Sequence, residues 1–236
     1  PSAAELTELG VDADRITVIR NGIDPLPADY AARRDPTTPD VAAGPDRGIR
    51  LCVLSRLVPH KQIEDALAVV ADLRRSYPGV HLDVIGGGWW ADRLVAHADS
   101  LGVADQVTFH GHVGEARKNA VLARADIHLM PSRKEGWGLA VTEAAQHGVP
   151  TVGYHSSTGL QESVDHGHTG LLVDGVDEMV SATRKLAEDP DEVRRLGDAA
   201  RRKAGGYSWA VTADGFLDLF TEIAAANSAA RQTARR

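Results

Sequence analysis

The sequence predicts an α/β fold in which a parallel β-sheet carries helices on both of its faces. From Ile49 onward, short apolar runs alternate with segments of helical spacing. The apolar runs lack the polar–apolar alternation of half-exposed strands, so they indicate strands buried on both faces. Hydrophobic residues make up 43% of the 236 residues, which is enough for a packed core. Strands and helices in this order form a parallel sheet with right-handed crossovers.

The first two segments of the chain precede this regular pattern. Ala3 to Leu9 has helical spacing, and Ile16 to Ile19 is a β-type run that ends at the turn signal Asn21-Gly22. We expect residues 1–24 to be an entry segment from a separate N-terminal domain. Residues 25–48 are rich in Pro, Asp, Ala and Gly without an apolar period, so they are predicted to form a loop or linker.

Residues 49–204 are predicted to form the α/β domain itself. The expected strands are short, continuous apolar runs at Ile49–Leu54, His81–Ile85, Val107–Phe109, Ile127–Met130, Thr151–Tyr154 and Gly170–Val173. The expected helices have apolar residues at helical spacing and lie at Ile63–Leu73, Trp90–Leu101, Arg117–Ala125, Leu139–His147, Gly159–Val164, Val176–Glu188 and Asp191–Lys203. Ligands of such sheets bind outside the carboxyl ends of the strands, where the candidate site residues fall.

The chain is predicted to end in one more helix. After a break at Gly205-Gly206, Ser208 has the side chain of an N-cap residue for a helix that we expect to end at about Ala225. We therefore assign residues 205–226 to a C-terminal helix. Residues 227–236 are rich in Ala and Arg and are expected to fray.

The composition argues against several classes of protein. A formal net charge of -7 argues against a nucleic-acid partner, because neutralising phosphates needs clustered cations. Cys52 is the only cysteine, so an intrachain disulfide framework is excluded and a buried, inert thiol is expected. No apolar run has the length of a membrane span, and the first residues lack a signal-peptide pattern. These features together predict a cytoplasmic protein.

The segment from Ser132 to Ala144 is the most informative part of the chain. Glu135 lies in a loop after a predicted strand, and Glu143 lies two helical turns further on. The start of the helix presents unpaired N–H groups and a positive dipole end, which bind phosphate. A carboxylate beside a phosphate is repelled by its negative charge. The two glutamates are therefore better suited to accept hydrogen bonds from neutral sugar hydroxyls. The segment therefore indicates one pocket for an anion and a polyol, as in a nucleotide sugar.

A structural alternative exists for this segment. An ordinary loop followed by a surface helix would leave both glutamates solvated. Two glycines flanking Trp137 argue against that alternative, because one glycine at a helix start is common and two are not.

Two other turns at strand ends carry candidate ligand-binding residues. Arg56 and Lys61 bracket the turn after the first strand, and a cation at a helix start is unfavourable unless an anion lies between. Two solvated surface cations are the alternative. The run Gly86-Gly87-Gly88 permits close approach of a ligand or of a neighbouring turn, and a tight βα turn explains it equally well.

The remaining polar residues are ambiguous. Glu115 could reach a base, but capping the helix that begins near Ala116 is the favoured single role. The small hydroxyl residues Ser156-Ser157-Thr158 make a second polar helix start. Histidines at positions 155, 166 and 168 invite a metal interpretation, yet no cysteine or carboxylate spacing supports zinc. Asp12-Ala13-Asp14 resembles a D-x-D metal motif but lies in a polar turn, so we expect no metal site.

Together these segments resemble the donor-binding half of a GT-B glycosyltransferase of the large retaining group called family 4. The resemblance covers Ile49 to about Val173. Its residues are Arg56 with Lys61, the stretch E-G-W-G-L-A-V-T-E from Glu135 to Glu143, Gly148-Val149-Pro150, and the segments 158–162 and 165–173. Residues 20–24 and Trp209 also match. Gly86 to Trp90 is bulkier than the family's usual turn, and Ser156 to Thr158 replaces a more glycine-rich one.

The resemblance implies a Rossmann-like domain and a role for each matching residue. Arg56 and Lys61 are expected to bind the donor diphosphate, and with Glu135 they are the catalytic candidates. The donor sugar and distal phosphate are expected to face Glu135 and the backbone of Gly136, Trp137, Gly138 and Leu139. Glu143 is expected to bind the ribose hydroxyls. Gly87, Val113 and Glu115 complete the donor site, the last two beside the base.

The implied activity is retaining transfer of a hexose-type sugar from a nucleoside diphosphate to an acceptor hydroxyl. Two cations and a helix start can stabilise the departing diphosphate, so no metal or other cofactor is expected. The acceptor site is expected in an N-terminal domain, through which alone peripheral membrane contact is expected. Without that domain we expect donor binding and little transfer. Two alternatives remain: a GT-B sugar-nucleotide epimerase, and a non-catalytic nucleotide-binding or flavodoxin-like regulatory module.

Overall fold

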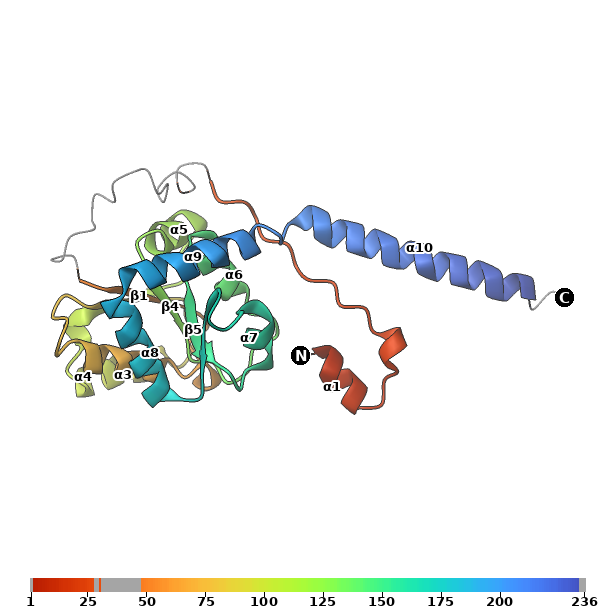
Figure 1. The fold of residues 1–236 in the computed structure, drawn as a ribbon. Helices are drawn as coiled ribbons and strands as arrows, with labels where there is room; N and C mark the ends of the chain where they lie inside the picture. The colour runs from red at the N-terminus through yellow and green to blue at the C-terminus, as the bar shows by residue number, and fades with distance from the viewer. Residues whose placement is uncertain (1, 28–29, 31–47, 234–236) are drawn as a thin grey trace. The chain divides into compact units, whose positions relative to one another are not determined.

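The computed structural model describes residues 2–27, 30 and 48–233, and the chain forms two compact units (Figure 1). One unit spans Leu26–Ala204 and contains the sheet. The other joins residues 1–25 to residues 205–236. Most of the predicted linker, residues 28–29 and 31–47, lies outside the described residues.

The larger unit is built on a six-stranded sheet in the order β3-β2-β1-β4-β5-β6. All five strand pairs are parallel, which confirms the predicted fold class. The strands are β1 (Arg50–Leu54), β2 (His81–Ile85), β3 (Val107–Gly111), β4 (Ile127–Met130), β5 (Thr151–Tyr154) and β6 (Gly170–Val173). The chain steps outward from β1 to β3 and then returns to β4 on the other side of β1. The strand order therefore reverses between β1 and β4.

In the described part of this unit, five helices connect the strands and two follow β6, all close to their predicted positions. They are α3 (Ile63–Leu73), α4 (Ala91–Ser100), α5 (Glu115–Leu122), α6 (Leu139–Gln146), α7 (Thr158–Ser163), α8 (Val176–Glu188) and α9 (Pro190–Ala204). Two short 3₁₀ turns, η3 (Pro59–Lys61) and η4 (Ala104–Gln106), precede α3 and β3. Helix α5 begins at Glu115 rather than at Arg117, because Gly114 already has the extended backbone of an N-cap.

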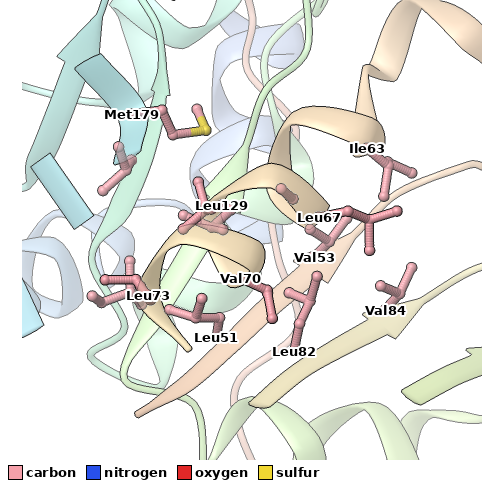
Figure 2. Close-up of a cluster of buried hydrophobic side chains, with 14 of the residues drawn as sticks. Leu51, Val53, Ile63, Leu67, Val70, Leu73, Leu82, Val84, Leu129 and Met179 are labelled. Atoms are coloured by element: carbon pink, nitrogen blue, oxygen red, sulfur yellow. The ribbon is translucent and has the colours of Figure 1, made fainter. Parts of the chain in front are cut away.

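The core consists of separate apolar layers on the two faces of the sheet. Figure 2 shows the larger layer, in which Leu67 and Val70 of α3 pack over Leu51 and Val53 of β1. On the other face, Cys52 packs in a smaller cluster with residues of α5 and α6. The Cys52 side chain is fully buried, as predicted. Because each buried leucine contributes about 1.5–3 kcal/mol, these layers hold the strand ends in fixed positions.

The smaller unit contains α1 (Ser2–Glu8), η1 (Ala13–Arg15) and α10 (Trp209–Thr233). The Ser208 hydroxyl accepts a hydrogen bond from the Val211 N–H at 3.3 Å, which confirms the predicted N-cap. Helix α10 continues to Thr233, beyond the predicted end at Ala225, because alanine-rich sequence has high helix propensity. No helix among the described residues is long and apolar enough to span a membrane.

Two other predictions for the first residues are decided by hydrogen bonds. The run Ile16 to Ile19 is not a strand, since no neighbouring strand in the described part of the chain pairs with it. The D-x-D pattern is a turn, because the Asp12 carboxylate accepts a hydrogen bond from the Asp14 N–H and caps η1. Instead of forming a sheet, the segment before Pro25 contacts α10, where the Thr212 hydroxyl donates to the Arg20 carbonyl at 2.8 Å.

Candidate functional site

The candidate site lies where the strand order reverses, at the carboxyl ends of β1 and β4. Parallel sheets bind ligands at such switch points, because the crossovers on either side leave in opposite directions. The loop after β1 carries Arg56 and Lys61, and the loop after β4 carries Glu135. The strand order thus places predicted residues from distant parts of the sequence on neighbouring loops.

Lys61 and Glu135 form an ion pair across the switch point. Their side chains are only 9% and 10% exposed. Two backbone features hold the pair. The Arg133 N–H donates to the His60 carbonyl at 3.1 Å, which ties the two loops together. Gln62, with φ of 45°, is the one non-glycine residue in the left-handed region among the described residues, and it turns the chain into α3.

The Glu135 backbone is supported from a third element, α7. A Cβ atom at Gly159 would lie 2.4 Å from the Glu135 carbonyl oxygen, so only glycine permits this approach. The sequence predicted a polar cradle at Ser156 to Thr158 instead. Ser157 is buried at the N-cap of α7 and makes no side-chain capping hydrogen bond. The polar cradle stays a prediction, and the observed contribution of α7 is the close backbone packing of Gly159 against Glu135.

Helix α6 begins directly after this loop. Its N-cap is Gly138, which has φ of 78° and provides no side-chain capping bond. Any other residue would be strained there. Gly136 and Leu139 are exposed beside this helix start, and Trp137 is half-buried. The first turn of α6 therefore has no side-chain cap, and its anion-binding role stays a prediction.

The Glu143 side chain is partly exposed and forms an ion pair with Lys118 of α5. The Lys118 Nζ atom lies 2.6 Å from Glu143 Oε1 and 2.8 Å from Glu115 Oε1. The predicted capping role of Glu115 is therefore wrong: its carboxylate binds Lys118, while Gly114 is the N-cap. Sequence reasoning missed Lys118. Its i,i+3 spacing from Glu115 was the available signal, but the contact with Glu143 joins two helices.

The charge of Lys118 is stabilised by this bridge. Burial is the largest single influence and lowers the pKa of Lys118. The hydrogen bonds from Glu115 and Glu143 and the charges of both carboxylates outweigh it, so the pKa is raised above its usual 10.5. Lys118 therefore remains protonated throughout the neutral range.

Arg56 is exposed, and its guanidinium group forms no ion pair or hydrogen bond with any residue that the structure describes. Its turn packs on the triple-glycine turn after β2, where the Leu57 N–H donates to the Gly87 carbonyl at 3.0 Å. A Cβ atom at Gly88 would lie 2.2 Å from the Leu57 carbonyl oxygen. Of the interpretations given for these glycines, close approach of a neighbouring turn is observed for Gly88.

Gly87 and Val113 lie on adjacent loops at the same edge of the sheet. A Cβ atom at Gly87 would lie 2.7 Å from the His112 ring, and Val113 follows that residue half-buried. The structure thus joins the predicted residues in three groups: Lys61 with Glu135, Glu115 with Glu143 through Lys118, and Gly87 beside the loop of Val113.

One of the histidines that invited a metal interpretation, His166, has a structural contact instead. His166 Nδ1 accepts a hydrogen bond from the Leu172 N–H at 2.9 Å and fastens the turn before β6. No group of three or more His, Cys, Asp or Glu side chains within residues 2–27, 30 and 48–233 is arranged to hold a metal ion. The expectation that the protein works without a metal stays a prediction.

Sequence comparisons identify relatives of the whole α/β unit. A family model described as glycosyl transferases group 1 matches residues 37–203. The chain is 34% identical to the glycogen synthase of Mycobacterium tuberculosis, over 92% of this chain and 51% of that protein. It is also 34% identical to the D-inositol 3-phosphate glycosyltransferase of Nocardia farcinica, over 93% and 50%. The chain spans about half the length of these curated relatives.

A third relative is the GDP-mannose-dependent alpha-(1-6)-phosphatidylinositol monomannoside mannosyltransferase of Mycobacterium tuberculosis, with 38% identity over 63% of this chain and 40% of that protein. Solved structures share the fold. Anabaena HepE in complex with UDP and glucose superposes with a TM-score of 0.78 at 20% identity, over 94% of this chain and 61% of that chain. For sucrose-phosphate synthase from Thermosynechococcus elongatus the TM-score is 0.77 at 23% identity, over 95% and 57%.

Proposed function

The chain belongs to the glycosyl transferases group 1 family, and from this premise we propose that it binds a nucleoside-diphosphate sugar at the carboxyl edge of its sheet. It would do so as the C-terminal, donor-binding half of a retaining glycosyltransferase. The acceptor hydroxyl would be bound by an N-terminal domain. The names of the relatives support this substrate class, since one uses GDP-mannose and the HepE structure holds UDP and glucose.

The observation that carries the proposal is the ion pair between Lys61 and Glu135 at the switch point. The competing interpretation, solvated surface charges, predicts exposed side chains, whereas both are about nine-tenths buried. Burying two charges costs several kcal/mol per ion before their attraction is counted. A buried pair is thus weak evidence for a role in stability, and it supports a role in ligand binding at this position.

The chemistry proposed for these residues follows from the charge that develops during transfer. As the bond between the sugar and the phosphate oxygen breaks, that oxygen keeps the bonding electrons and the diphosphate becomes more negative. Arg56, Lys61 and the start of α6 would stabilise this charge. One cation at about 4 Å contributes on the order of 4 kcal/mol at an effective dielectric of about 20. These groups could therefore replace a divalent metal.

The remaining residues are assigned to the other parts of the donor. Glu135 and the backbone of residues 136–139 would face the sugar and the distal phosphate. Glu143 would accept hydrogen bonds from the ribose, and Gly87, Val113 and Glu115 would lie toward the base. We further propose a cytoplasmic location, with any membrane contact made through the N-terminal domain.

Calorimetric titration of the chain with UDP-, GDP- and ADP-glucose and with GDP-mannose tests the proposal. We expect one nucleotide sugar to bind best. Glu143→Ala should lower its affinity about tenfold or more, because hydrogen bonds to a charged group are worth about 1.5–3 kcal/mol. Glu188→Ala, an exposed glutamate at the end of α8, is the matched control and should bind normally. A regulatory module would bind none of these donors, and that result would refute the proposal.

A further inference from the structure

Lys118 occupies a position between two carboxylates that no sequence motif indicated. It lies on α5, while Glu143 lies on α6, and both helices pack on the same apolar cluster. The Lys118 side chain is 14% exposed, and those of Glu143 and Glu115 are 30% and 80% exposed. The lysine therefore has its aliphatic stem covered and its ammonium group held at the partly solvated end of the site.

The bridge leaves one oxygen of the Glu143 carboxylate available. Lys118 binds Oε1, and Oε2 of Glu143 accepts no hydrogen bond from any described residue. A carboxylate with one oxygen fixed by a cation cannot rotate freely, so the direction of the other oxygen is set. A vicinal diol needs an acceptor of this kind, because each of its hydroxyl groups must donate in a defined direction.

The bridge also balances charge. A diphosphate at the start of α6 would repel the carboxylate of Glu143, which lies about one turn further along the same helix. The ammonium group of Lys118 reduces this repulsion. Glu115, whose side chain is mostly exposed, accepts a second hydrogen bond from the lysine.

We propose that Lys118 is a positioning residue that orients Glu143 toward the ribose diol and thereby makes nucleotide binding depend on an intact ribose. The inference rests on the proposed function, since it assumes that Glu143 meets the donor ribose. It adds a residue and a specificity that the function alone does not include. Lys118 acts through Glu143 and does not touch the reacting atoms.

A structural role for Lys118 makes a different prediction. If the lysine only joined α5 to α6, its removal would weaken binding of every nucleotide to the same extent. If it orients Glu143, its removal weakens binding only of nucleotides that carry the diol. The ratio of the dissociation constants of a 2′-deoxynucleotide and its ribonucleotide distinguishes these roles.

The experiment measures this ratio by calorimetry for whichever of UDP, GDP and ADP binds best, together with its 2′-deoxy form. Lys118→Met removes the charge and keeps the stem, and we expect it to lower the ratio about threefold to tenfold, the factor that corresponds to ordering one side chain. Lys118→Arg, which keeps the charge, should restore most of the ratio. Lys185→Met, an exposed lysine on α8, is the matched control and should leave it unchanged.

A second pair of variants tests the inference independently, in case Lys118→Met does not fold. In a Glu143→Gln background, Lys118→Gln should have no further effect on the ratio, because the acceptor it orients is already altered. An equal loss for both nucleotides in Lys118→Met, or an undiminished ratio, would overturn the inference. Arg56→Ala separates this result from failure of the proposed function. Arg56→Ala should weaken the binding of both nucleotides equally. If neither nucleotide binds to the unmodified chain, the proposed function itself is wrong.

Discussion

The two glutamates of the motif from Glu135 to Glu143 meet lysines in different surroundings. At one end of the site, Lys61 and Glu135 are both about nine-tenths buried. At the other end, Lys118 joins a half-buried Glu143 to a Glu115 that is 80% exposed. The attraction between charges depends on the surrounding dielectric, so it is stronger in the buried pair, where the desolvation cost is also larger. Equal residue types at a regular spacing therefore do not imply equal roles.

The two ends also differ in what supports them. The backbone of Glu135 is packed against Gly159 of α7, and the loop is tied to its neighbour through Arg133 and His60. The other end is held by side chains that reach between α5 and α6. We expect the first end to be rigid before a ligand arrives and the second to depend on its ion pairs. Three further predictions test this contrast.

The largest effect is expected from Lys61→Met, which leaves the Glu135 carboxylate buried without its partner. Breaking a buried ion pair costs about 3–5 kcal/mol of stability. We expect the free energy of unfolding, measured in urea, to fall by an amount near the lower limit. The double variant Lys61→Met with Glu135→Leu should regain most of the stability and remain unable to bind the donor. Lys118→Met should cost at most about 1 kcal/mol, because its pairs are partly solvated. An equally small loss for Lys61→Met would remove the contrast.

A smaller effect is expected from Gly159→Ala. The added methyl group meets the Glu135 carbonyl oxygen, and because this neighbour is backbone, the loop must shift. Overpacking of this kind costs about 1–3 kcal/mol, and the displaced Glu135 should also weaken donor binding. Gly215→Ala on α10 is the control, since the nearest atom to a Cβ atom there lies at 3.5 Å, an ordinary van der Waals distance. Unfolding curves and calorimetry of both variants check the prediction, and equal effects would contradict it.

The smallest effect is expected from Glu115→Gln. Its carboxylate is largely in solvent, where ion pairs contribute about 0–1 kcal/mol and are screened by salt. At about 0.05 M NaCl the free energy of unfolding should fall by at most about 0.5 kcal/mol, and at about 1 M NaCl this difference should disappear. Lys118 keeps its bond to Glu143 in this variant, so the preference for ribose should survive. A salt-independent loss would mean that Glu115 is more deeply coupled to the site than its exposure indicates.

Much of the fold could be read directly from the chain. The runs Ile127–Met130 and Thr151–Tyr154 have the bounds that were predicted, and all their residues are buried, as expected of strands covered on both faces. The run Ile16 to Ile19 looked similar but is not a strand. Apolar composition is necessary for a strand, yet the hydrogen bonds come from a neighbour that local sequence does not reveal.

The candidate site was predictable in its parts and not in its contacts. The sequence alone determined the order of strands and helices, the glycine-rich turns, and the charged residues at the carboxyl edge, because each follows from local spacing and conformational preference. Only the tertiary structure decided that Lys61 meets Glu135, that Gly159 supports that pair, and that Lys118 joins Glu115 to Glu143. These contacts arise where separate loops and helices converge on the reversal between β1 and β4. Burial, which sets the strength of each charge pair, is likewise a property of that packing.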